Sequence, residues 1–117
     1  MDSILPRLQQ LSPGTVIPTS NFTIKGWGKR RKLPALVYFI PNHSNSEKPT
    51  EKGNTLEWEL AYRRLLDTGE FTRKWFYANL PRCADECPCN FTTIGGIFSL
   101  LGLAKYERKG VYRSVVS

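Results

Sequence analysis

The chain has 117 residues, the length of one domain, which excludes a (β/α)₈ barrel and a dinucleotide-binding fold with a second substrate domain. Hydrophobic residues make up 40% and charged residues 23%, a composition typical of a globular protein rather than a disordered one. Seventeen Lys and Arg against ten Asp and Glu give a formal net charge of +7. This excess favours an anionic partner, with nucleic acid as the first candidate.

Neither a membrane span nor a secretion signal is indicated. No apolar run approaches the 18 residues that a transmembrane helix needs, and the first residues lack the basic flank and apolar stretch of a signal peptide. We therefore expect a protein that makes no membrane contact, is cytoplasmic or nucleoid-associated, and is not secreted.

The first half of the chain predicts an arm, a hairpin and a loop. Residues 1–20 predict a short helical or irregular N-terminal arm, ending in turn-forming residues. Residues 21–41 predict a β-hairpin, because 22–27 alternates apolar and polar residues and 35–40 is rich in β-formers. Residues 42–54 are polar, contain Pro and Gly, and predict a mobile loop.

The second half predicts three helices. Asn54 is a suitable N-cap for the first helix. Gly69 is suited to end this helix, because glycine readily adopts the positive φ that the C′ position often requires. Thr72 is placed to cap the second helix, which Pro81 would stop. After a loop, Thr92 is expected to cap the third helix.

The third predicted helix has an apolar stripe and leads into a hairpin. Its apolar residues recur at helical spacing, which places small residues on the opposite, outward face. The inward set is Ile94, Ile97, Phe98 and Leu101, and the outward set is Thr92, Thr93, Gly96 and Ser99. Residues 104–116 then predict a strand, a tight turn at Gly110 and a second strand.

The order helix, helix, loop, helix, hairpin over residues 54–116 resembles winged helix-turn-helix DNA-binding domains. The resemblance is sharpest in 91–113, where a third helix runs through Leu101-Gly-Leu103 into a hairpin with a basic, glycine-containing tip. It implies that the third helix would enter the major groove and that the wing would lie along the backbone or in the minor groove. The expected fold is thus α+β, a single domain over 1–117 in which a basic β-hairpin precedes a winged helix over 55–116.

The net charge is concentrated in two segments. Residues 25–32 carry five cations and no acid, while the predicted wing carries four cations against Glu107, so the remainder of the chain is close to neutral. The expected phosphate contacts are Lys29, Arg30, Arg31, Lys32, Arg73, Lys74, Lys105, Arg108 and Lys109. The expected base or groove contacts are Asn90, Thr92, Thr93 and Ser99. For 28–32, a solvated hairpin tip and a nuclear-localisation-like signal are the alternatives.

The third helix is poorly equipped to read bases. Between residues 92 and 101 it holds no Arg, Lys, Asn or Gln, the side chains that usually make bidentate base contacts. We therefore expect limited sequence specificity, with recognition of the backbone or of DNA shape. The adjacent Gly95 and Gly96 allow either close approach to another molecule or tight packing against a neighbouring element.

Three cysteines, Cys83, Cys87 and Cys89, are clustered between the second and third helices. Ordinary reduced cysteines are the preferred interpretation. A zinc site with His43 or a water as fourth ligand is a lower-ranked alternative, because the C-x₃-C-x-C spacing is unusual for zinc. A disulfide between Cys83 and either Cys87 or Cys89 is the third interpretation. No cofactor other than this zinc is expected.

The sequence therefore favours a small basic protein that binds nucleic acid, DNA before RNA, with a role in regulation as an extension of this hypothesis. The alternative is a winged-helix module for protein–protein interaction or self-association as a homodimer, using the Gly95–Gly96 face. No enzyme is expected, because the chain has one histidine and neither a nucleotide-binding glycine motif nor a recognisable catalytic set. The expected core is Trp58, Leu60, Leu65, Phe71, Phe76, Ile94, Ile97, Phe98, Leu101 and Tyr112.

Overall fold

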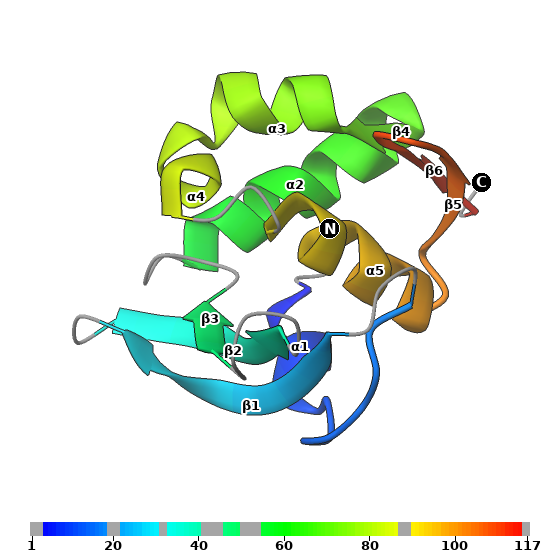
Figure 1. Cartoon of the computed structure of the whole chain (residues 1–117). Helices are drawn as coiled ribbons and strands as arrows, with labels where there is room; N and C mark the ends of the chain where they lie inside the picture. The colour runs from blue at the N-terminus through cyan, green and yellow to red at the C-terminus, as the bar shows by residue number, and fades with distance from the viewer. Residues whose placement is uncertain are drawn as a thin grey trace.

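The computed structural model describes residues 4–18, 22–30, 33–40, 46–49, 55–86 and 90–115. The elements in chain order are α1 (Leu5–Gln9), β1 (Thr23–Arg30), β2 (Leu33–Ile40), β3 (Ser46–Pro49), α2 (Thr55–Thr68), β4 (Glu70–Thr72), α3 (Arg73–Asn79), α4 (Pro81–Glu86), α5 (Asn90–Leu100), β5 (Ala104–Arg108) and β6 (Val111–Ser114). Helices α2–α5 lie above one three-stranded antiparallel sheet, and a second three-stranded antiparallel sheet lies at one end of these helices (Figure 1), so the α+β class is confirmed.

The N-terminal sheet has the strand order β1-β2-β3 and contains the predicted hairpin. Its strands are longer than expected, since Lys29 and Arg30 belong to β1 and pair with Pro34 and Leu33. The prediction of a polar loop over 42–54 is wrong at residues 46–49, because they form the strand β3, which pairs with β2. The sequence of β3, Ser-Glu-Lys-Pro, is polar because an edge strand is well served by charged residues and proline.

The N-terminal arm folds back onto β1 rather than projecting from the molecule. Ile24 N donates to Thr15 O at 2.9 Å, and Ile17 N donates to Phe22 O at 2.9 Å. The fully buried side chains of the arm include Ile4, Leu8 and Ile17. Ile4 and Leu8 are four residues apart, the spacing that places two side chains on one helical face. The arm is therefore part of the core.

The C-terminal half joins helices and a hairpin through the second sheet, which has the strand order β4-β6-β5. The sequence did not predict β4, a strand of three residues that pairs with β6. The prediction of a loop after Pro81 is wrong for α4, because proline is well tolerated in the first turn of a helix. The Thr72 cap is confirmed: its hydroxyl accepts a hydrogen bond from Trp75 N at 3.1 Å.

The core is centred on Phe71. The rings of Trp75, Phe76, Phe91 and Phe98 lie around it at centroid distances of 5.0–6.4 Å. Such ring pairs contribute beyond the area that they bury.

Eight of the ten predicted core residues are buried. Leu101 is partly buried and packs against the core, whereas Leu60 is 38% exposed. The prediction for Leu60 is wrong because α2 turns Trp58, Ala61 and Leu65 inward, and a residue two positions after Trp58 cannot share that face. None of the helices formed by the described residues is long and apolar enough to cross a membrane.

Candidate nucleic-acid interface

Helix α5, the predicted recognition helix, is the most deeply buried helix of the C-terminal half. Its first residue, Asn90, is fully buried and makes two side-chain hydrogen bonds. Asn90 Oδ1 accepts from Tyr38 Oη at 2.7 Å, and Asn90 Nδ2 donates to Cys83 O at 2.8 Å. The prediction that Asn90 precedes the helix and contacts DNA is therefore wrong for this structure, because its amide joins α5 to β2 and α4.

The outward face predicted for α5 is covered by the protein itself. Thr93 is fully buried and Gly96 is buried, so their predicted exposure is wrong. A Cβ at Gly95 would overlap the Tyr112 ring, and a Cβ at Gly96 would overlap Ile17 and lie 2.6 Å from Pro18 O. Of the two interpretations of these glycines, tight internal packing is confirmed.

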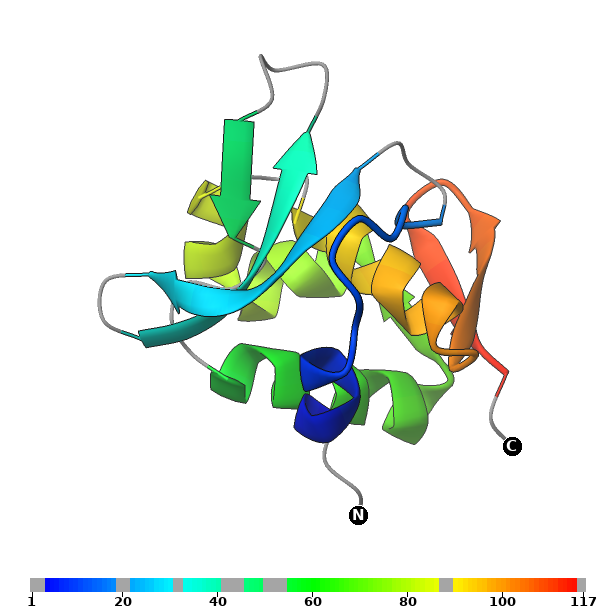
Figure 2. The ribbon, with the colours of Figure 1, turned by 90° about the horizontal axis from the view of Figure 1, so that it is seen from below.

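Thr92 and Ser99 are the two predicted contacts on α5 that stay partly exposed. The hydroxyl oxygen of Ser99 is nonetheless buried and has no hydrogen-bond partner among the described residues. Figure 2 shows the arm and β1 passing across α5. The predicted docking face for a second protein is thus occupied by residues of the same chain.

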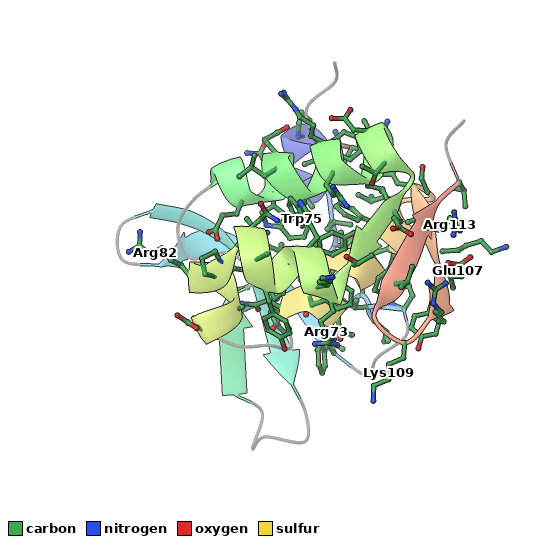
Figure 3. All side chains as sticks on the ribbon, turned by 90° about the horizontal axis from the view of Figure 1, so that it is seen from above. Arg73, Trp75, Arg82, Glu107, Lys109 and Arg113 are labelled. Carbon is green, nitrogen blue, oxygen red and sulfur yellow. The ribbon has the colours of Figure 1, made fainter. Side chains whose placement is uncertain are left out.

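Six cations lie on α3 and on the neighbouring hairpin β5–β6, and we call this group the wing-side basic surface. Its six members are Arg73, Lys74, Lys105, Arg108, Lys109 and Arg113. Arg73 N donates to Gly110 O at 2.9 Å, which fixes the first turn of α3 beside the hairpin turn. Figure 3 shows Arg73 and Lys109 on neighbouring segments at this edge of the molecule.

The members of this surface differ in how firmly they are held. Lys74, Lys105 and Lys109 are exposed and make no ion pair with another described residue. The Arg73 guanidinium lies 4.6 Å from the centroid of the Phe91 ring, and its Nη1 donates to Tyr77 Oη at 3.5 Å. The surface therefore combines three exposed lysines with one arginine that is positioned by aromatic contacts.

Glu107 engages the two remaining cations. Its carboxylate accepts from Arg113 Nε at 2.7 Å and Nη2 at 3.1 Å, and from Arg108 Nη1 at 2.9 Å. The hydrogen bond from Arg113 is the main cause that lowers the pKa of Glu107, and the same bond raises the pKa of Arg113. Glu107 is thus ionised at neutral pH and competes with an anionic ligand for both guanidinium groups.

The second predicted basic segment lies elsewhere. Lys29 and Arg30 are at the end of β1, while Arg31 and Lys32 lie outside the described residues. Figures 1 and 2 place that end of β1 and the hairpin β5–β6 at opposite ends of the molecule, whose longest dimension is 36 Å. The structure therefore does not bring the two basic segments into one patch.

The cysteine hypotheses fall largely on residues outside the described part. Cys83 lies in α4 with its side chain fully buried, whereas Cys87 and Cys89 are not described. Within the described ranges, no three His, Cys, Asp or Glu side chains are grouped as metal ligands. The zinc and disulfide hypotheses remain predictions.

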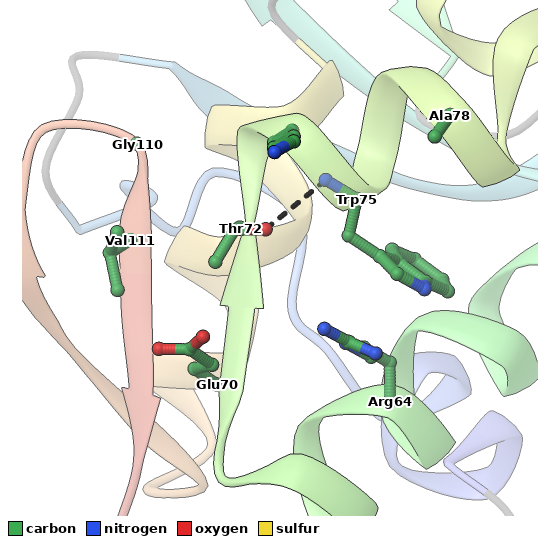
Figure 4. Close-up of a pocket in the computed structure, with 8 residues that line it drawn as sticks. Arg64, Glu70, Thr72, Trp75, Ala78, Gly110 and Val111 are labelled. Carbon is green, nitrogen blue, oxygen red and sulfur yellow. Dashed lines mark hydrogen bonds between the residues drawn. The ribbon is translucent and has the colours of Figure 1, made fainter.

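Sequence reasoning missed a groove beside the basic surface. It has a volume of about 540 Å³ and lies between α2, α3 and the strands β4 and β6. Its lining comprises Arg64, Glu70, Thr72, Lys74, Trp75, Ala78, Gly110 and Val111 (Figure 4). No local pattern marks it, because the residues come from three separate parts of the chain.

Comparisons with known proteins add no relative. No protein-family model matches the chain, and searches of curated proteins and of solved structures found no match. The case for a function therefore rests on the surface geometry.

Proposed function

We propose that the chain binds nucleic acid through its phosphates, with double-stranded DNA as the favoured ligand and with little sequence specificity. The observation that carries this proposal is the wing-side basic surface, where α3 and the hairpin β5–β6 contribute six cations against two neighbouring acids, Glu107 and Glu70. Cations grouped on one face neutralise neighbouring phosphates and release the counterions condensed on the duplex.

We further infer a winged-helix arrangement for residues 55–115, in which β5–β6 is the wing. This inference is supported by the chain order of helices followed by a hairpin, and by β4, which pairs with β6 and so holds the hairpin against α2 and α3. Under this proposal the wing and the first turn of α3 lie along the DNA backbone, while α5 supports them from within.

Limited specificity follows from which groups are exposed. Asn90, the side chain best suited to read adenine, is committed to Tyr38 and Cys83. The partly exposed Thr92 and Ser99 are the remaining candidates on α5. Lysines, which dominate the unpaired part of the surface, contact phosphate as point charges and carry little sequence information.

The test is a salt titration of binding to a 20-base-pair duplex, followed by fluorescence anisotropy. Of the six cations of this surface, four make no ion pair with another described residue, namely Arg73, Lys74, Lys105 and Lys109. Four phosphate contacts give a slope of log K against log salt of about −3.6, and contacts from residues 29–32 would make it steeper. No binding at low salt, or a slope near zero, would contradict the proposal.

Two variants locate the contact. The double substitution Lys105→Ala, Lys109→Ala removes two exposed cations and is expected to reduce the slope by about 2, equally for unrelated duplex sequences. Arg7→Ala is the matched control, because Arg7 is an exposed cation on α1. Charge reversal by Arg30→Glu and Arg31→Glu measures the contribution of the other hairpin. Single-stranded DNA and RNA of equal length show whether the duplex is preferred.

A further inference from the structure

The groove beside the wing-side basic surface combines an aromatic wall with two cations. Trp75 is half-buried, and the Arg64 guanidinium carbon lies 5.9 Å from the centroid of its ring. Figure 4 shows the Arg64 side chain reaching from α2 beneath the ring toward β4. Lys74 supplies the second cation, and Ala78, Gly110 and Val111 supply apolar surface.

The guanidinium of Arg64 marks where an anionic ligand atom would be favourable. Its Nε is buried and has no hydrogen-bond partner among the described residues, so the charge is poorly compensated within the protein. The side chain as a whole is partly exposed, and its Nη groups are the donors that a ligand can reach. A ligand that brings an anionic oxygen to them gains a charge-assisted hydrogen bond and compensates the charge.

The one acid in the groove lining does not cancel the two cations. Glu70 pairs in register with Arg113 of β6, and the charge of Glu70 contributes to the raised pKa of Arg113. Figure 4 shows the Glu70 carboxylate on the β6 side, apart from Arg64 and Trp75. The side of the groove formed by α2 and α3 is therefore net positive.

We propose that this groove binds a small aromatic anion, a planar ring that carries one carboxylate. Its carboxylate accepts from Arg64, with Lys74 as the second cation of the lining, while its ring packs against Trp75. The volume of about 540 Å³ is in the range of small-molecule sites, which are mainly apolar with a few polar groups that fix orientation. The proposal is independent of nucleic-acid binding, and it is tested in the absence of nucleic acid.

The probe is benzoate, titrated into the ¹⁵N-labelled full chain and followed by NMR. We expect shifts at the amides of Thr72, Ala78 and Val111 and at the indole of Trp75. Benzamide, a neutral isostere, and acetate, which lacks the ring, are each expected to bind at least about tenfold more weakly. Equal affinity for benzamide or for acetate would overturn the proposal, as would an absence of shifts in the groove.

The matched variants are two adjacent arginines of α2. Arg64→Gln removes the partly buried cation of the groove and is expected to raise the Kd for benzoate about tenfold, while Arg63→Gln removes an exposed one and is expected to leave it unchanged. Lys74→Gln, at an exposed position, should raise the Kd about threefold and keeps the test valid if Arg64→Gln fails to fold. Unchanged affinity in Lys74→Gln together with either unchanged affinity or misfolding in Arg64→Gln would overturn the proposal.

Discussion

Helix α5 and the hairpin β5–β6 follow each other in the chain, but they have opposite environments. α5 carries no charged residue and is buried over most of its length, whereas the eleven residues of 104–114 carry five charged side chains, all exposed. The N-terminal arm and sheet account for this difference, because they cover the face of α5 that would otherwise meet solvent. The comparison teaches that the order of helices and strands does not decide which element is available to a ligand.

The largest expected effect concerns the packing of α5. Gly95→Ala places a methyl group against the Tyr112 ring, and we expect it to lower the free energy of unfolding by about 2–3 kcal/mol through overpacking. Urea denaturation followed by circular dichroism measures this. Thr92→Ala, at a partly exposed position of the same helix, is the control and should change stability by less than about 0.5 kcal/mol. An unchanged urea midpoint for Gly95→Ala would show that α5 is not packed as described.

The second effect concerns the hydrogen bond between the two halves of the chain. Asn90→Ala removes the two hydrogen bonds that its side chain makes with Tyr38 Oη and Cys83 O, and the expected loss is about 2 kcal/mol. Tyr38→Phe should cost about 1 kcal/mol. In a double-mutant cycle the two losses should be non-additive by about 0.5–1 kcal/mol, since both substitutions remove the same bond. Strict additivity would mean that Asn90 and Tyr38 do not interact.

The third effect concerns the hairpin. Glu107→Gln removes the carboxylate that holds Arg108 and Arg113, and both guanidinium groups become available to phosphate. We expect duplex affinity to rise about threefold and the salt slope to become steeper by up to about 1.8. The salt-titrated anisotropy assay measures both quantities. A weaker affinity would indicate that Glu107 positions the arginines for the ligand instead of competing for them.

The same carboxylate sets an expected pH dependence. Because Arg113 lowers the pKa of Glu107 in the folded state, its contribution to stability is present at neutral pH and is lost as the pH falls through that lowered value. The contribution is small, since the group is exposed and screened by solvent. Glu107→Gln should therefore be slightly less stable than wild type at pH 7 and equally stable in strong acid, as measured by thermal unfolding across pH.

The smallest effect concerns Ser99. Its hydroxyl is buried without a partner among the described residues, so Ser99→Ala should leave stability unchanged or raise it by up to about 0.5 kcal/mol. Duplex affinity should stay within twofold of wild type. A larger loss of affinity would indicate that α5 contacts the duplex through Ser99.

The sequence predicted the elements better than their environments. The hairpin 21–41, the three helices and the C-terminal hairpin each follow from a local signal, such as alternating residues, the Thr72 cap or the turn at Gly110. The short strand β4 and the edge strand β3 were missed, because three or four residues carry too little periodicity and form strands only through their partners.

Burial of α5 could not be predicted for a different reason. Thr93 and Gly96 look like an exposed face because they are small and weakly polar, yet small residues are also what a close packing contact requires. The two cases differ only in whether a distant segment such as Ile17–Pro18 lies against them. The groove at Trp75 was missed for the same physical reason, since its walls are brought together by tertiary packing.

The hydrogen bond from Tyr38 to Asn90 spans 52 positions of sequence. A contact at that separation forms only after a long loop has closed. The chain therefore loses conformational entropy early in folding, before the hydrogen bond contributes any stabilisation. The side-chain oxygen of Asn90 meets Tyr38 only when β2 has docked, whereas the bond from Asn90 Nδ2 to Cys83 O is local. The chain is therefore expected to fold slowly for its size, and the face of α5 is the part that a partly folded molecule would present to its surroundings.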